Sequence, residues 1–285
     1  MAALVAALAI CTVLIARPAH VDRDAERSSS RDIVLCLDVS GSALPYDRAV
    51  IETYLELVSH FRGERIALSI FNSTSRTVFP LTDDYDLVSS QLTKAADALR
   101  GVESQDDIDK MSDKDYQKIA DWLEGTQNRK NSTSLIGDGL VSCAAMIPGF
   151  AYGDTSGAAR QRPASIVLAT DNVASGTPTY SLAQALDMAE ASHISVDGLF
   201  SGPRQSEGDA TTTEMKQQIE SRGGTFLTQS GSSDINELVR QIDSRRTSES
   251  RRSSQAALID APGWWTLMLV VLLAIWMILA WRLRR

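Results

Sequence analysis

The segment DIVLCLDVSGS, at residues 32–42, decides the fold of this chain. Its apolar run stops at Asp38, as a buried strand of a parallel sheet does at the edge of the sheet. Asp38, Ser40 and Ser42 then place a carboxylate and two hydroxyls at alternate positions. Gly41, between the two serines, allows a tight turn. The segment therefore predicts a strand that continues into a polar loop whose side chains share one cavity.

Similar apolar runs recur along the chain and alternate with segments of helical periodicity. The predicted strands are residues 32–38, 65–71, 76–81, 165–170, 194–200 and 225–228. The predicted helices are residues 45–61, 84–100, 116–123, 137–147, 181–192, 213–222 and 234–244. This alternation predicts an α/β fold, a doubly wound and mostly parallel sheet with helices on both faces. Pro80 limits its strand to an edge or to a strand end.

Two more polar loops are predicted at the carboxyl ends of these strands. Asp171 follows the run 165–170, and the hydroxyl-rich residues 131–134 lead into a helix that opens with Gly-Asp-Gly. Ligands of doubly wound sheets bind beyond the carboxyl ends of the strands, near the point where the strand order reverses. Carboxylate and hydroxyl oxygens suit a hard divalent cation. The sequence thus predicts a metal site with a position open to water or to an incoming acid.

The loop residues resemble the metal-ion-dependent adhesion site of the von Willebrand factor type A (VWA) domain. That motif is Asp-x-Ser-x-Ser, then a Thr in a second loop, then an Asp after a hydrophobic strand. Its first part is matched by Asp38, Ser40 and Ser42, and its last part by Asp171. The resemblance covers about residues 31–245 and implies a VWA fold of the Rossmann-like class.

The hydroxyl of the second loop departs from the family pattern. Counting back from Gly139 and Leu140 lands on Ser134, which keeps the hydroxyl of the usual Thr and lacks its methyl group. Thr133 is the alternative. The resemblance implies that the metal is held by Asp38, Ser40, Ser42, Ser134 and Asp171. It also implies Mg²⁺ as the ion, with Mn²⁺ and Ca²⁺ as alternatives.

The resemblance implies a binding module, not an enzyme, with a protein partner whose Asp or Glu carboxylate completes the metal coordination. A type A domain between apolar ends also resembles the bacterial aerotolerance (Bat-type) membrane proteins, which implies a MoxR-class AAA+ ATPase system or other membrane proteins as partners. Two alternatives stay open. One is metal-assisted hydrolysis, although the three loops contain no His or Glu to act as a general base. The other is a structural scaffold whose metal only orders the loops.

Composition narrows the function classes further. The chain has 285 residues and a net charge of −8, which argues against binding to a nucleic-acid backbone. Its 3 Cys have no metal-ligand spacing, so neither a disulfide scaffold nor a thiolate zinc site is expected, and we interpret Cys36 and Cys143 as core residues. Asp138 is interpreted as an acid that interacts favourably with its helix dipole. The acidic residues 103–115 are interpreted as a solvated insertion beside the site.

Both ends of the chain are apolar. Residues 264–281 carry no charge and have Trp at both ends, and a helix of this length spans roughly 27 Å, close to the hydrocarbon thickness of a bilayer. Residues 1–17 predict a shorter anchor, with a signal peptide as the alternative. The protein is therefore expected in the cell membrane with one or two spans. The VWA domain is expected on the extracytoplasmic side, because the Arg-rich tail resists translocation.

The predicted division of the chain follows from these segments. It comprises an N-terminal transmembrane segment (1–17), a linker (18–31), the VWA domain (32–245), a second linker (246–263), a C-terminal transmembrane helix (264–281) and a basic tail (282–285).

Overall fold

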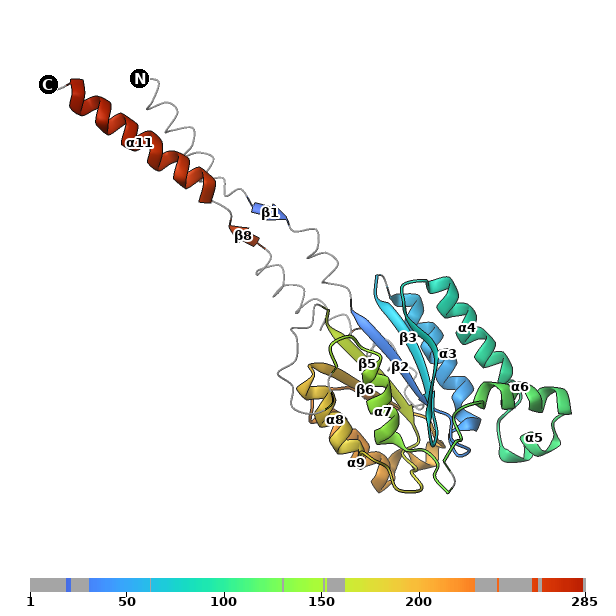
Figure 1. The fold of residues 1–285 in the computed structure, drawn as a ribbon. Coiled ribbons are helices and arrows are strands. Elements are labelled where there is room, and N and C mark those ends of the chain that lie inside the picture. Colours follow the sequence, from blue (N-terminus) through green and yellow to red (C-terminus); the bar gives the residue numbers. More distant parts are fainter. Residues whose placement is uncertain are drawn as a thin grey trace. The chain divides into compact units, whose positions relative to one another are not determined.

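The computed structural model of the chain is shown in Figure 1. It describes residues 19–21, 31–61, 63–129, 131–150, 152, 162–228, 240, 258–260 and 263–283. The chain divides into two compact units, one formed by residues 28–247 and the other by residues 1–27 together with 248–285.

The larger unit is a mixed α/β structure built on a six-stranded sheet with the order β4-β3-β2-β5-β6-β7. Its strands are β2 (Asp32–Asp38), β3 (Arg65–Phe71), β4 (Ser75–Thr82), β5 (Ala164–Thr170), β6 (Ile194–Phe200) and β7 (Phe226–Leu227). All neighbours pair in parallel except β4, which is antiparallel to β3 at one edge. The six predicted strands are thus confirmed, and so is the edge position expected from Pro80. The architecture is consistent with the predicted VWA or Rossmann-like fold.

Helices cover both faces of this sheet (Figure 1). They are α3 (Leu44–His60), α4 (Tyr85–Ala98), α5 (Gln105–Lys110), α6 (Asp113–Leu123), α7 (Ile136–Ala145), α8 (Leu182–Ala191) and α9 (Ala210–Glu220), with a 3₁₀ turn η1 (Arg204–Gly208). Six of the seven predicted helices are confirmed within a few residues. The predicted helix 234–244 lies, apart from Arg240, outside the described residues. The insertion 103–115 contains α5, a helix that its charged sequence did not predict.

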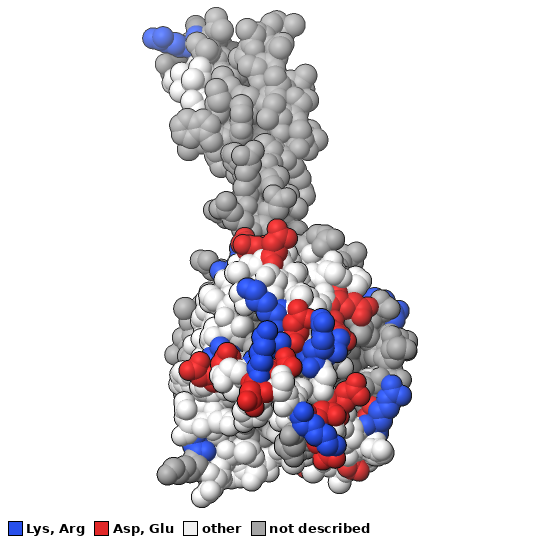
Figure 2. Space-filling view, turned by 90° about the vertical axis from the view of Figure 1, so that its right-hand side faces the viewer, with Lys and Arg blue, Asp and Glu red and all other residues white. Residues whose placement is uncertain are grey.

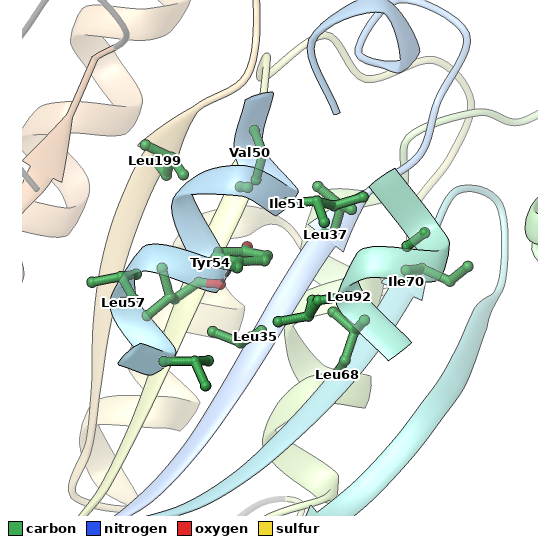
Figure 3. Close-up of a cluster of buried hydrophobic side chains, with 14 of the residues drawn as sticks. Leu35, Leu37, Val50, Ile51, Tyr54, Leu57, Leu68, Ile70, Leu92 and Leu199 are labelled. Atoms are coloured by element: carbon green, nitrogen blue, oxygen red, sulfur yellow. Dashed lines mark hydrogen bonds between the residues drawn. The ribbon is translucent and has the colours of Figure 1, made fainter. Parts of the chain in front are cut away.

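Side chains alternate between two hydrophobic cores, one on each face. Leu35 and Leu37 of β2 pack with α3, α4 and α6, whereas Val34 and Cys36 pack with α7, α8 and α9. Every residue of β2 and of β5 is buried, as the apolar runs predicted for strands covered on both sides. Figure 3 shows the first core, where Tyr54 of α3 points at the sheet among leucines and isoleucines.

The tyrosine also ties the two central strands together. Its hydroxyl, which is fully buried, lies 3.2 Å from the carbonyl oxygen of Cys36 and 3.1 Å from that of Val167, within hydrogen-bond distance of both. A buried hydroxyl needs such a partner, because leaving it unpaired costs about 1–3 kcal/mol. The contact holds α3 against β2 and β5, the strands that lead into two of the three loops predicted to bind metal.

A disulfide joins Cys36 of β2 to Cys143 of α7, with Cα atoms 6.1 Å apart. Both cysteines are fully buried, which confirms their interpretation as core residues. Their pairing was not predicted, because 107 residues separate them in the sequence. The bond fixes α7, which begins just after the hydroxyl-rich loop, to the strand that ends at Asp38.

The smaller unit contains a two-stranded antiparallel ladder of β1 (Ala19–Val21) and β8 (Leu258–Asp260), and the helix α11 (Gly263–Leu283). The predicted C-terminal helix is therefore present, and the predicted N-terminal segment 1–17 lies outside the described residues. Among the described residues, no helix has the length and hydropathy needed to cross a membrane.

Candidate metal centre

The topology reverses beside β2, and this point sets the position of the site. From β2 the chain passes through α3 to β3 on one side, and later returns to β5 on the other side. Leu37 pairs with Ala169, so the next residues, Asp38 and Thr170, end the two strands side by side. Doubly wound sheets bind ligands in the crevice outside such a switch point. The predicted acids Asp38 and Asp171 therefore meet at the expected edge of the sheet.

Asp38 is fully buried, and three hydrogen bonds hold its carboxylate. Its Oδ2 accepts from Ser134 Oγ at 2.5 Å and from Thr170 Oγ1 at 2.7 Å. Its Oδ1 accepts from the backbone N–H of Ser40 at 3.0 Å. One side chain thus joins all three predicted loops, although Asp38 and Ser134 are 96 residues apart in the sequence.

The two loop serines lie next to this carboxylate. Ser40 Oγ and Ser42 Oγ are 3.3 Å apart, and the Ser42 hydroxyl is also hydrogen-bonded to Asp171. Asp171 is 5% exposed, and its Oδ1 accepts from the backbone N–H of Val173 at 2.9 Å. Ser40 is buried whereas Ser42 is exposed, so the cluster of oxygen atoms reaches from the interior to solvent.

The second loop brings Ser134, and not Thr133, to Asp38. Ser134 is fully buried and has a left-handed backbone with φ 52°. Its N–H donates to Asn72 Oδ1 at 2.9 Å. Thr133 is exposed and its backbone pairs with Ser175. A strained backbone conformation of this kind persists only where surrounding contacts hold it in place. Such residues are common at functional sites.

The helix after this loop depends on its two glycines and on Asp138. A Cβ on Gly137 would lie 2.0 Å from the carbonyl oxygen of Tyr180, and one on Gly139 would lie 2.4 Å from the ring of Phe71. The Asp138 carboxylate accepts from the N–H groups of Thr179 and Tyr180 at 2.8–3.1 Å. Asp138 does stand in the first turn of α7, as expected, and in addition it anchors the loop that follows Asp171.

Burial raises the pKa of the acids in and behind this cluster. For Asp38, desolvation is the main cause and the nearby charge of Asp171 adds to it, so its pKa rises from the usual 3.8 to about 6. Desolvation also raises the pKa of Asp171. Within the described part of the chain, no cationic side chain contributes to these two shifts, so a bound cation would favour the ionised form of both acids.

A third buried acid lies behind the cluster and was missed by the sequence analysis. Asp47, in the first turn of α3, is fully buried, and the nearby charges of Asp38 and Asp171 disfavour its ionisation. Ser201 Oγ lies 3.4 Å from its Oδ1, while Oδ2 has no hydrogen-bond partner among the described residues. Burial raises the pKa of Asp47 well above its usual value. Nothing in the sequence separates it from the exposed acids common in first helix turns.

Two further polar residues of the site were not predicted, although both stand at the carboxyl ends of predicted strands. Thr170 directly precedes Asp171, and Asn72 directly follows β3, so both are polar residues at the carboxyl ends of strands. Polar residues at this edge of a doubly wound sheet are candidates for ligand binding. Their hydrogen bonds to Asp38 and Ser134 show that both orient the candidate ligands.

The donor set fits a hard cation with an incomplete coordination shell. In the part of the chain that the structure describes, no group of three or more His, Cys, Asp or Glu side chains is placed to hold a metal ion. The candidate donors are instead two carboxylates and three hydroxyls, and oxygen donors of this kind suit Mg²⁺, which usually keeps several waters. The two carboxylates match the charge of the ion and the neutral hydroxyls add none, so a coordination position held by water stays open to a further carboxylate.

Comparison with known proteins gives no family assignment. No family model and no curated protein matches this chain. Among solved structures, it is similar to the conserved hypothetical protein BatB from Bacteroides thetaiotaomicron, with 16% identity over 77% of this chain and 99% of that chain and a TM-score of 0.46. An aerotolerance-related membrane protein from Bacteroides fragilis gives 16% identity, coverages of 74% and 99% and a TM-score of 0.43.

A third similar structure is the manganese-loaded TRAP protein from Plasmodium vivax, with 13% identity, coverage of 76% of this chain and 72% of that chain, and a TM-score of 0.39. Similarity at this level assigns neither a family nor a function to this chain.

Proposed function

We propose that this chain is a membrane-anchored VWA-type protein that binds a protein partner through a divalent cation. The cation, Mg²⁺ in first place, is held by Asp38, Ser40, Ser42, Ser134 and Asp171. An Asp or Glu carboxylate of the partner completes its coordination. The protein acts as a binding module, not as an enzyme, in assembly or signalling at the membrane.

The network around Asp38 carries this proposal. Its carboxylate accepts hydroxyl hydrogen bonds from Ser134 and Thr170, and the Ser42 hydroxyl joins Asp171 to the same cluster. Buried carboxylates of raised pKa without a cationic neighbour are costly to ionise, and a bound cation removes that cost. The exposed Ser42 side of the cluster offers the route by which an outside carboxylate reaches the ion.

The disulfide supports placing the VWA domain outside the cytoplasm. Disulfides persist in oxidising compartments and are rare in the reducing cytosol. The bond between Cys36 and Cys143 is therefore expected in a domain that has crossed the membrane. The uncharged residues 264–281, which belong to α11, are the proposed anchor. Membrane proteins, a MoxR-class AAA+ ATPase system among them, form the proposed context.

Isothermal titration of the full chain in detergent micelles tests the metal site directly. We expect Mg²⁺ and Mn²⁺ to bind, and Ser40→Ala to weaken binding about 10–100-fold, as the loss of a ligand or of its support does. Ser221→Ala is the matched control, because Ser221 is exposed and its hydroxyl donates to the carbonyl oxygen of Gln218 in the preceding helix turn. Absence of binding to the unmodified chain at millimolar metal would refute the proposal.

Two readouts separate the alternatives. A scaffold metal predicts that EDTA lowers the melting temperature but leaves capture of membrane partners unchanged, whereas an adhesion site predicts that EDTA and Ser40→Ala both abolish capture. Metal-assisted hydrolysis predicts Mg²⁺-dependent turnover of generic phosphate esters that is lost in Asp38→Ala. We expect no such turnover.

A further inference from the structure

A pocket opens directly beside the first metal-binding loop. It has a volume of about 380 Å³ and begins at Gly41, the residue between Ser40 and Ser42. Its opposite wall comes from α5 and α6, the helices of the acidic insertion. A Cβ on Gly41 would meet nothing within 4 Å, so this side of the loop faces open space. The pocket therefore adjoins the loop that carries Ser40 and Ser42.

The lining of the pocket is apolar at one part and polar at another. The apolar part consists of Leu44, Ile108, Ile119 and Leu123. The polar part includes Glu124, Gln127 and Asn128. An uncharged apolar side chain gives no hydrogen bond to polar groups that it covers, which is unfavourable at this part of the lining. A side chain with an aliphatic stem and a cationic head satisfies both parts.

The charge of the surrounding segment also favours a cation. Residues 103–124 contain eight acidic residues and three lysines, a net charge of −5. Two of these lysines are already engaged within the segment, Lys110 with Asp106 at 3.8 Å and Lys118 with Asp115 at 2.8 Å. Figure 2, viewed from the side of these helices in Figure 1, shows acidic and basic side chains interspersed over this face. A partner with only carboxylates would be repelled here.

We propose that this pocket binds the side chain of an arginine or lysine that neighbours the metal-bound carboxylate in the partner protein. The stem of that residue packs against Leu44, Ile119 and Leu123, and its head donates to Glu124. This inference rests on the proposed adhesion site, and it specifies the partner segment as an acid with a basic residue one or two positions away. A cationic side chain in the pocket also offsets the repulsion between the acidic insertion and the carboxylate of the partner.

A set of synthetic peptides tests the inference with the full chain in detergent micelles. Each peptide has one Asp in a Gly-Ser background and carries Arg, Lys, Leu or Ser one or two positions from it. Binding is measured by fluorescence anisotropy with millimolar Mg²⁺ and with EDTA. We expect the Arg and Lys peptides to bind about tenfold more tightly than the Ser peptide, as a hydrogen bond to a charged group contributes.

Two variants locate the preference in the pocket. Glu124→Gln removes the charge at the wall, and Ala120→Trp fills the space from a position on α6 outside the metal loop. Both should bring the Arg peptide to the affinity of the Ser peptide while Mg²⁺ affinity and melting temperature stay unchanged. Glu214→Gln, an exposed acid of α9 that bonds to Gln218, is the matched control and should keep the preference.

The outcomes distinguish this inference from the proposed function. Mg²⁺-dependent binding of all Asp peptides without a preference for Arg or Lys would overturn the pocket inference alone. Tighter binding of the Leu peptide than of the Arg and Lys peptides would contradict the proposal that the pocket holds a cationic side chain. If no Asp peptide bound in a Mg²⁺-dependent manner, both the adhesion site and the pocket inference would fall.

Discussion

Raising the pH should destabilise the metal-free protein, and Asp38 provides the main reason. Its pKa is about 6 in the folded protein against the usual 3.8, because burial disfavours the charged form. The folded state therefore holds a proton that the unfolded state has already released. The resulting loss of stability is absent below pH 3.8, grows across the window up to about pH 6 and is complete above it. Its full size is about 3 kcal/mol at about 1.36 kcal/mol for each pKa unit.

Thermal unfolding followed by circular dichroism measures this effect on the full chain in detergent with EDTA. Between about pH 4.5 and pH 7 the linkage relation gives a loss of about 2 kcal/mol. For a domain of roughly 150–250 residues that corresponds to a fall in melting temperature of about 4–8 °C. Asp171 and Asp47, whose pKa values are raised too, act in the same direction. Asp38→Asn is the control, because it removes the titrating group and should reduce the fall.

Adding Mg²⁺ at pH 7 should restore the stability that the metal-free protein loses on ionisation of Asp38. A ligand at about 100 times its dissociation constant stabilises the folded state by about 2.7 kcal/mol, close to the loss from Asp38. The reversal should be absent in Asp38→Asn. A melting temperature of the metal-free protein that rises or stays constant between these pH values would refute the argument that burial of Asp38 opposes its ionisation. If Mg²⁺ raised the melting temperature equally in the unmodified chain and in Asp38→Asn, the ion would bind elsewhere.

Three other changes should have distinct effects. Ser134→Ala removes a hydroxyl from the cluster and should weaken Mn²⁺ binding about 10–100-fold in a titration, whereas Thr133→Ala, at an exposed position, should leave it unchanged. Reduction of the disulfide between Cys36 and Cys143 should lower the free energy of unfolding in urea by about 2–5 kcal/mol, and an unchanged midpoint would contradict its structural role. Gly139→Ala should destabilise the protein by about 1–3 kcal/mol, because its Cβ meets an aromatic ring at 2.4 Å; a neutral effect would show that the ring can move.

The sequence by itself determined the sheet and the edge at which to look for the site. Apolar runs that end in Asp38 and Asp171 identify buried parallel strands, since a strand covered on both faces has no polar alternation. Local periodicity also located most helices. These features are local, so a one-dimensional pattern suffices to find them. It failed at α5, where the charged residues 103–115 gave no apolar period.

Only the tertiary structure decided which groups meet. Ser134 and not Thr133 contacts Asp38, because the loop turns through a left-handed residue and directs the hydroxyl inward. Cys36 meets Cys143 because β2 and α7 pack on the same face of the sheet. Asp47 is buried because the first turn of α3 packs near the carboxyl end of β6, where Ser201 contacts it, while its position in a first helix turn would equally suit an exposed acid. Contacts between residues about a hundred positions apart depend on strand order and helix packing, which no local pattern contains.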